Sequence, residues 1–452
     1  MTEIPMTSSR AISSLGRRGA LLMSAALLSG CSMFEGSDKK SIPGIKIPVL
    51  PPHEPLEVNE AATPVVLPSP VARAAWPQAS GNARHNPGVA ALPARLSQAW
   101  STGIGAGATY RRSLHAQPVI ADGRVFTIDA NGFVDAVLLS SGRHIWRQPM
   151  RPKRDTSFAF GGGLAYAEGA LYVATGFAEL RMLDPATGAT RWSKNLGQPA
   201  RSAPTIGGGL IYIVLLDNTL TALDAKTGDF TWRFPTSSSS NSMFGAGAPA
   251  YDQGIVVAGF GTGMVAGINA MTGSAVWEQS LAAGYDAANP LDVSSIVANP
   301  VIGDNLAVLT SVAGSTVAFD LRSGRRIWGK DAGGAETPAI AGDWLFLLTD
   351  DQRLAAIHMA DGYVSWLTDL PAYQNPKKDY GPIRWHGPIL AGDGLILTGS
   401  DERMIVVDAR TGILLTKPDR SLNLHGVSDA APIAAAGTLL ALTRDAVLTA
   451  YR

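Results

Sequence analysis

The sequence LDPATGATRW at residues 183–192 recurs three more times with changes, as LDAKTGDFTW (223–232), INAMTGSAVW (268–277) and FDLRSGRRIW (319–328). Weaker copies are LLSSGRHIW (138–146), IHMADGYVSW (357–366) and VDARTGILLT (407–416), the last with Leu415 taken as the Trp substitute. In every copy that ends in Trp, a Gly stands four residues before it. Self-similarity at this spacing is the signature of a repeat architecture, so the fold follows from the repeat.

Each copy predicts the second half of a four-stranded antiparallel blade. Upstream of it runs an apolar stretch such as TIGGGLIYIVL or ILAGDGLILTG, which begins after a Pro and contains a Gly turn. A strand start tolerates the missing N–H of Pro, and a turn Gly supplies a positive φ. The Trp recurs once per copy and predicts packing between blades; these residues are Trp146, Trp192, Trp232, Trp277, Trp328 and Trp366.

The two chain ends predict how the ring closes. The C-terminal stretch APIAAAGTLLALTRDAVLTAYR supplies three strands, and the segment ending at Trp100 supplies a fourth strand without predecessors. We therefore predict an all-β fold, an eight-bladed β-propeller with one blade built from both ends. A seven-bladed ring is the alternative if two copies merge, because the copy at 138–146 lacks the usual Asp.

The first 75 residues predict an export signal and a spacer. A basic region is followed by nine apolar or small residues, 20–28, which are too few to span a bilayer. Leu-Ser-Gly-Cys at 28–31 resembles the bacterial lipobox, which implies removal of residues 1–30 and acylation (palmitate) of Cys31. The Pro-rich residues 31–75 predict an extended spacer, and residues 76–452 the propeller.

Composition excludes several classes of function. Lys and Arg number 37 and Asp and Glu 37, so the chain has no basic field for nucleic acid or anionic lipid. Membrane contact is therefore predicted only through the anchor. The single Cys excludes an intramolecular disulfide. The repeat Asp residues each open a turn and predict caps for turn N–H groups. We predict no catalytic residue, no metal site and no cofactor.

The Asp-x-x-Thr-Gly-x-x-x-Trp repeat resembles the PQQ-type propellers, and the lipobox, spacer and single ring together resemble the BamB family. This resemblance implies a scaffold lipoprotein on the periplasmic face of the outer membrane, within the β-barrel assembly machinery. Its partners would be the periplasmic domains of the BamA-like barrel insertase and unfolded outer-membrane proteins.

The resemblance also implies two contact loops, residues 237–249 and 284–300. The first carries Met243 and Phe244 at its apolar tip and lacks the family's Arg; the second carries Asp286 and Asp292. The alternative is that Met243 and Phe244 cover a blade and that the two Asp cap turns. Which face of the ring binds the partner, the stoichiometry and the substrate range are left open at this point.

Two other functions remain as alternatives. A PQQ-dependent dehydrogenase resembles this repeat, but such enzymes commonly need a vicinal disulfide, which one Cys cannot form. A polysaccharide-binding propeller is the other, with Tyr110, Tyr373, Tyr380 and Trp385 as stacking rings, three of them in the loop 371–388. His386 and His425 occupy corresponding places in successive repeats and could both face the channel mouth.

Overall fold

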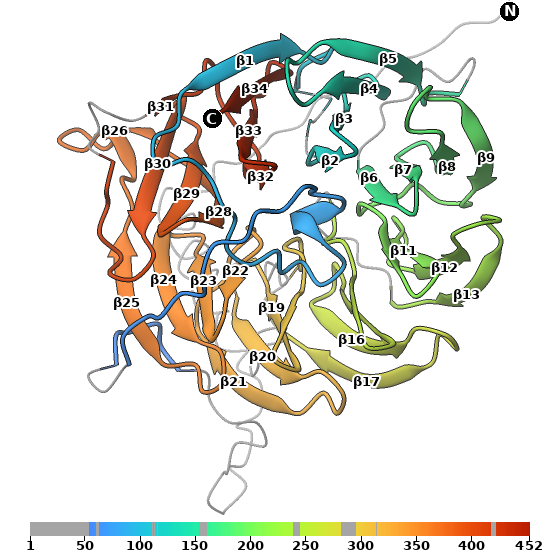
Figure 1. Cartoon of the computed structure of the whole chain (residues 1–452). Helices are drawn as coiled ribbons and strands as arrows, with labels where there is room; N and C mark the ends of the chain where they lie inside the picture. Colours follow the sequence, from blue (N-terminus) through green and yellow to red (C-terminus); the bar gives the residue numbers. More distant parts are fainter. Residues whose placement is uncertain are drawn as a thin grey trace, which may run out of the picture. The chain divides into compact units, whose positions relative to one another are not determined.

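The computed structural model describes residues 54–59, 63–110, 112, 114, 116–152, 161–237, 245–281, 295–312, 314–416 and 422–452. Eight four-stranded sheets follow one another around a ring, each antiparallel (Figure 1). The eight-bladed prediction is confirmed, and the seven-bladed alternative is wrong. The first strand of each blade lies innermost and the fourth lies at the rim (Figure 1).

The strands of blades 1 to 4 are β2 (Val119–Ala121), β3 (Arg124–Ile128), β4 (Phe133–Leu138), β5 (His144–Pro149); β6 (Gly162–Ala167), β7 (Ala170–Thr175), β8 (Glu179–Leu183), β9 (Thr190–Asn195); β10 (Thr205–Gly207), β11 (Leu210–Val214), β12 (Leu220–Asp224), β13 (Phe230–Phe234); β14 (Ala250–Asp252), β15 (Ile255–Gly259), β16 (Met264–Asn269) and β17 (Ala275–Ser280).

The strands of blades 5 to 8 are β18 (Val301–Gly303), β19 (Leu306–Thr310), β20 (Thr316–Asp320), β21 (Arg326–Lys330); β22 (Ala339–Ala341), β23 (Trp344–Leu348), β24 (Arg353–His358), β25 (Val364–Asp369); β28 (Trp385–Ala391), β29 (Gly394–Gly399), β30 (Arg403–Asp408), β31 (Leu422–Asn423); β32 (Ile433–Ala435), β33 (Thr438–Leu442), β34 (Val447–Tyr451) and β1 (Gln98–Gly103). A hairpin of β26 (Tyr373–Asn375) and β27 (Tyr380–Pro382) lies between blades 6 and 7, and the short 3-10 helix η1 covers Ala79–Gly81.

Blade 8 joins the two ends of the propeller, as the sequence predicts. Strand β1 pairs antiparallel with β34, with Trp100 opposite Ala450. The apolar cores lie between neighbouring blades rather than at one centre. For example, Tyr212 and Val214 of blade 3 pack with Val256 and Ala258 of blade 4. Ring closure therefore leaves every blade with an apolar neighbour on each side.

The repeat Trp links each blade to the next through a glycine. The Trp277 indole N–H donates to the Leu321 carbonyl at 2.8 Å, and a Cβ added to Gly324 would lie 2.4 Å from the ring. Seven such pairs run around the described ring: Trp100–Gly142, Trp146–Gly188, Trp192–Gly228, Trp232–Gly273, Trp277–Gly324, Trp328–Gly362 and Trp366–Gly412. The turn glycine thus has two reasons to be Gly, since its φ is positive and its missing Cβ makes room for the indole.

The absent eighth Trp has a structural explanation. A Trp on blade 7 would cover the turn between the third and fourth strands of blade 8, but there the two strands come from opposite chain ends. No turn glycine exists for it to cover. Leu415 was predicted to hold this place on a fourth strand, which is wrong: the fourth strand is β31, and Leu415 is 55% exposed.

The repeat Asp residues cap their turns. Asp184 accepts hydrogen bonds from the backbone N–H of Ala186 and Thr187 at 2.9 and 3.0 Å. Asp224, Asp320 and Asp408 make the same pair of contacts, as does the amide oxygen of Asn269. An Asn side chain therefore makes the same cap without a charge.

These caps predict a loss of stability in acid. A hydrogen bond from Arg191, with backbone N–H bonds, lowers the pKa of Asp184 to about 2. Backbone N–H groups lower the pKa of Asp224, and the Ser323 hydroxyl and backbone lower that of Asp320. Because these pKa values are depressed, their contribution is present above the unfolded pKa of about 3.9 and is lost as pH falls through the folded values.

The test replaces Asp184, Asp224 and Asp320 together by Asn, the residue that already caps blade 4. The melting temperature of the wild type is expected to fall more steeply than that of the triple variant between about pH 4 and pH 2. Circular dichroism melts from pH 7 to pH 2 measure it. Parallel curves would show that the caps do not carry the acid sensitivity.

Residues 54–59 and 63–75, in the second half of the predicted spacer, pack on the blades. Leu56 and Val65 are each 4% exposed and belong to blade cores. The Glu54 N–H donates to the Gly329 carbonyl at 3.1 Å, and the buried Lys330 ammonium lies 2.6 Å from the Glu54 carboxylate. Residues 54–59 and 63–75 therefore differ from the prediction of a spacer over 31–75, and its first part, 31–53, lies outside the described residues.

Residues 71–91, which we call the channel segment, cross the middle of the ring (Figure 1). Trp76 and Ile120 of β2 exchange two backbone hydrogen bonds of 2.9 Å, and Ala90 makes two of 2.9 Å with Leu390 and Gly392 of blade 7. Further bonds to first strands or the turns that follow them come from Arg73, Pro77, Gln78, Ala83 and Arg84. The channel segment, which is interrupted by η1 and the turn at 82–85, thus bonds to the inner edges of seven blades.

Candidate functional site

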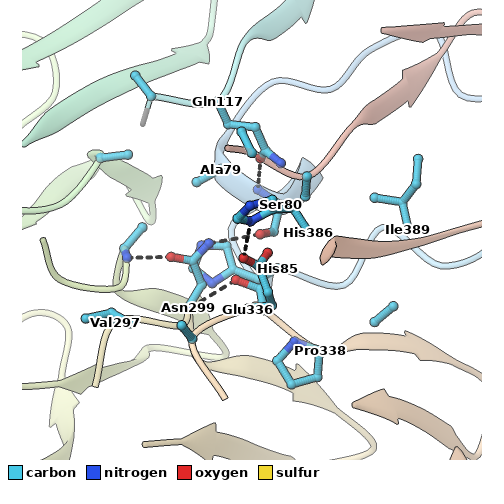
Figure 2. A pocket seen from close by; sticks show the side chains of 18 of the residues that line it. Ala79, Ser80, His85, Gln117, Val297, Asn299, Glu336, Pro338, His386 and Ile389 are labelled. Carbon is cyan, nitrogen blue, oxygen red and sulfur yellow. Dashed lines mark hydrogen bonds and ion pairs between the residues drawn. The ribbon is translucent and has the colours of Figure 1, made fainter. Parts of the chain in front are cut away.

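A cavity of about 380 Å³ lies in the channel, between the channel segment and the starts of the first strands (Figure 2). Ser80, His85, Asn299, Glu336 and His386 lie together on it (Figure 2). The channel segment is part of its lining because Trp76, Ser80, His85 and Gly88 all border the cavity. The sequence analysis did not foresee this use of the segment.

The C-terminal ends of the two predicted contact loops, which we call the loop feet, contact each other at this cavity. The Ala248 N–H donates to the Asn299 side-chain oxygen at 2.7 Å, and Gly247 packs so closely on the Ala298 carbonyl that a Cβ would lie 2.3 Å away. Both loops join a fourth strand to the next first strand, so they arise on the same face of the ring. The predicted contact residues Met243, Phe244, Asp286 and Asp292 lie outside the described residues.

His386 and Glu336 form a pair at the cavity. The His386 Nδ1 lies 2.7 Å from Glu336 Oε1, and the Gly387 N–H donates to Glu336 Oε2 at 3.1 Å. Since a carboxylate accepts, the imidazole carries its proton on Nδ1 in this contact. The corresponding His425 lies elsewhere: it is exposed and contacts Gln98 Oε1 at 2.8 Å through Nε2. Of the two His predicted for the channel mouth, only His386 borders the cavity.

His85 is the buried imidazole of the channel segment. It is 1% exposed, and its Nδ1 lies 2.7 Å from the Pro300 carbonyl, which accepts only. Burial lowers the pKa of His85 to about 4, so the ring is neutral at physiological pH. Its Nε2 is therefore a lone-pair acceptor, and within the described residues it has no hydrogen-bond partner.

The aromatic residues of the polysaccharide alternative do not act as one surface. Trp385 is 1% exposed, belongs to the core between blades 6 and 7, and donates its indole N–H to the Pro371 carbonyl at 2.8 Å. Tyr110 is fully exposed, and Tyr380 is 73% exposed on the hairpin of β26 and β27. Trp385 is therefore unable to stack on a sugar.

The described residues contain no group of three or more His, Cys, Asp or Glu placed to hold a metal ion. Over the same ranges, no helix has the length and apolar character needed to cross a membrane.

One signal in the sequence could have revealed that the residues before and within the channel segment pack on the blades. Leu56, Val65 and Trp76 are large apolar residues in a Pro-rich stretch, and all three are buried. A solvated spacer buries no apolar surface, so large apolar side chains that recur along it would not be expected. Composition alone hides this signal, since Pro is frequent both in spacers and in segments that add to a sheet edge.

Comparison with protein families matches residues 130–368, more than half of the chain, to the family model "Outer membrane protein assembly factor BamB". The protein of that name from Salmonella typhimurium is 25% identical over 353 residues, which cover 76% of this chain and 78% of the relative. The match to the family model includes the blades on which both loop feet arise.

Solved structures show the same fold. The crystal structure of BamB from Moraxella catarrhalis aligns with a TM-score of 0.67 at 18% identity, covering 79% of this chain and all of that one. The quinohemoprotein alcohol dehydrogenase from Comamonas testosteroni aligns at 0.65 with 16% identity, covering 83% of this chain and 80% of that one. At these identities the likeness concerns the fold alone, which an assembly factor and an enzyme share.

Proposed function

The chain belongs to the family of outer membrane protein assembly factor BamB, and from this premise we propose that it is a non-catalytic scaffold of the outer-membrane β-barrel assembly machinery. Its partners are the periplasmic domains of the BamA-like barrel insertase and unfolded outer-membrane proteins. The protein acts by holding loops on a rigid ring, since binding residues are commonly carried by loops of a stiff scaffold.

One structural observation carries the proposal: the feet of the loops 237–249 and 284–300 meet through Ala248 and Asn299. Two loops rooted together on one face can contact one partner at the same time. Met243 and Phe244 supply apolar anchors, and Asp286 and Asp292 supply charge near them. Large apolar anchors dominate the energy of such contacts, while rim charges contribute less.

Membrane attachment is the second part of the proposal. Removal of residues 1–30 exposes Cys31 for acylation, and multiple acyl chains give a durable anchor. The protein then stands on the periplasmic face of the outer membrane. The described propeller unit begins at about residue 54, where Glu54 bonds to blade 5.

The proposal predicts that Met243→Asp combined with Phe244→Asp weakens insertase binding at least tenfold. Placing two charges where apolar anchors must be desolvated removes more than about 1.4 kcal/mol of binding free energy. Co-purification from cross-linked envelopes and titration with the insertase's periplasmic domains measure the loss.

Met271→Asp is the matched control. Met271 is an apolar residue, 82% exposed, in the turn between β16 and β17, and that turn lies on the opposite side of the blade from the loops. It should leave binding unchanged. Equal binding by the wild type and the double variant would remove the loop 237–249 from the contact.

A further inference from the structure

We propose that the channel cavity binds a small organic anion that carries one carboxylate group. The site is separate from the loop contact proposed above, because it takes a small molecule and needs no partner protein. Three features of the described residues support it: a row of polar side chains whose spare groups are donors, an excess of positive charge, and apolar side chains on the rest of the wall.

Hydrogen bonds join four polar residues into one row along the cavity, which we call the polar row. Gln117 Oε1 accepts the Ser80 backbone N–H at 2.8 Å, and the Asn299 side-chain amide donates to Ser80 Oγ at 2.9 Å (Figure 2). The Asn299 backbone N–H in turn donates to Thr337 Oγ1 at 3.1 Å. All four residues border the cavity, so the polar row is a continuous strip of its wall.

Backbone N–H groups fix which atoms of the polar row are acceptors. Because an N–H only donates, Gln117 must turn its side-chain oxygen toward Ser80, and Thr337 Oγ1 must accept from Asn299. The Asn299 side-chain oxygen is held in the same way by the Ala248 N–H at 2.7 Å.

The groups that the polar row leaves unused are donors. They are the Gln117 Nε2 amide and the hydroxyl hydrogens of Ser80 and Thr337, none of which has an acceptor within the described residues. Gln117 Nε2 is moreover not among the described polar atoms that are enclosed without a partner. A ligand that presents acceptor oxygens therefore fits the polar row, and a carboxylate presents two.

The two acids of the lining already have partners. Glu336 lies 2.7 Å from His386 Nδ1 through one carboxylate oxygen and accepts the Gly387 N–H at 3.1 Å through the other. Asp429 lies 2.6 and 2.7 Å from two nitrogens of Arg444. Each carboxylate oxygen thus faces a donor of the protein, which weakens its repulsion of an anionic ligand.

Positive charge is in excess in the lining. Arg201 and Arg384 both border the cavity, and once the Asp429–Arg444 pair is set aside, two bases against the one acid Glu336 leave one positive charge. The exposed Arg384 guanidinium makes no hydrogen bond or ion pair within the described residues. A guanidinium matches a carboxylate with two parallel N–H groups. One surplus charge suits a ligand with one carboxylate and not with several.

Apolar side chains form much of the remaining wall. Val297, Pro338 and Ile389 border the cavity (Figure 2). They can contact the hydrocarbon part of a ligand whose carboxylate faces the polar row. The volume of about 380 Å³ lies at the small end of ligand pockets, which measure about 300–1,000 Å³.

The test titrates the full-length protein in detergent with 4-fluorobenzoate and follows the ligand by fluorine NMR. The neutral 4-fluorobenzamide and the cationic 4-fluorobenzylamine have a similar size and serve as comparisons. The carboxylate should bind at least tenfold more tightly than the amide, and the amine should not bind, because the polar row offers hydrogens and the surplus charge is positive. No partner protein is present, so the result is independent of the loop contact.

Gln117→Glu is the sharpest variant. Its carboxylate can still accept from the Ser80 N–H and the Trp76 indole N–H, the two bonds that Gln117 Oε1 makes now, while the spare donor becomes a negative oxygen. Binding of 4-fluorobenzoate should fall at least tenfold. Gln374→Glu is the matched control, because Gln374 is exposed on β26 and does not border the cavity, and it should bind as the wild type does.

Two further variants test the charge and the space. Arg384→Gln should weaken binding at least threefold, whereas Arg143→Gln, at an exposed position between β4 and β5, should leave it unchanged. Ala335→Trp fills the cavity and should lower binding at least tenfold. Ala430→Phe fills it from another blade and replaces Ala335→Trp if the melting temperature shows that variant to be misfolded.

Three results would overturn the site: no binding of 4-fluorobenzoate, equal binding of the carboxylate and the amide, or undiminished binding by a folded Gln117→Glu or cavity-filled variant. Tighter binding of pyrroloquinoline quinone, which carries three carboxylates, would also overturn it, because a surplus of one charge would then not select the ligand.

Discussion

Replacing Trp277 by Ala is expected to lower the free energy of unfolding by about 3–5 kcal/mol. The indole is 6% exposed between blades 4 and 5, stacks on Phe319 with ring centroids 5.7 Å apart, and lies on Gly324. Its removal leaves a cavity and also frees the Leu321 carbonyl, which now accepts the indole N–H at 2.8 Å. Loss of packing and loss of a hydrogen bond add in the same direction.

Leu415→Ala is the matched control, since Leu415 is a large apolar residue near the end of the last repeat but is 55% exposed. It is expected to change stability by no more than about 0.5 kcal/mol. Guanidinium unfolding followed by Trp fluorescence and circular dichroism measures both variants, with the shift read at unchanged m-value. A Trp277→Ala curve that overlays the wild type would contradict the role of the Trp between blades.

Gly324→Ala is expected to cost about 2–5 kcal/mol, a large effect for one added methyl group. The φ of Gly324 is +67°, which costs a residue with a Cβ about 1–2 kcal/mol. The new Cβ would in addition lie 2.4 and 2.5 Å from Trp277 Cγ and Cβ, and such overpacking adds about 1–3 kcal/mol. The indole has no room to withdraw, because Leu321 and Phe319 hold it.

Gly169→Ala separates the two causes. Gly169 has a φ of +73°, close to that of Gly324, but a Cβ there would meet nothing within 4 Å. It should therefore lose only the backbone part, about 1–2 kcal/mol. The change in the unfolded chain is the same Gly→Ala in both, so it cancels in the comparison. Equal losses at the two positions would show that the Trp contact does not require the glycine.

The repeat made the fold predictable because each blade is a local unit. A Pro start, a Gly turn, a Thr-Gly turn and a Trp recur within about 45 residues, and strand pairing inside a blade joins neighbours in sequence. Closure of the ring was also predictable from the sequence. Three strands at the C-terminal end lack a fourth, and one strand before the first blade lacks partners, so the two together make one blade. Leu415 was misplaced because the pattern assumed that blade 7 copies the others.

The residues that line the channel cavity could not be predicted from the repeat. The cavity brings together Ser80, Asn299 and His386, which lie far apart in the sequence, and nothing local marks them as neighbours. Glu336 was not singled out at all, although its carboxylate holds His386. His386 and His425 were predicted to hold corresponding places, which is wrong. His386 lies in β28, two residues before Pro388, whereas His425 lies between β31 and β32, seven residues before Pro432, and only the first borders the cavity.

The sequence by itself determined the eight blades and the Asp caps, since each depends on periodic contacts between residues close in the chain. It also indicated the shared closing blade, because three strands remain at one end of the chain and one at the other. The tertiary structure alone decided that residues 54–59 and 63–91 belong to the ring, that the feet of both loops meet, and that the channel segment lies on the inner edges of seven blades. These features depend on backbone groups at strand edges, and every residue type except Pro carries the same N–H and C=O. Backbone bonds alone therefore do not mark which edge the segment binds, and side chains such as Gln78 and His85 find their partners Ile206 and Pro300 only in the assembled ring.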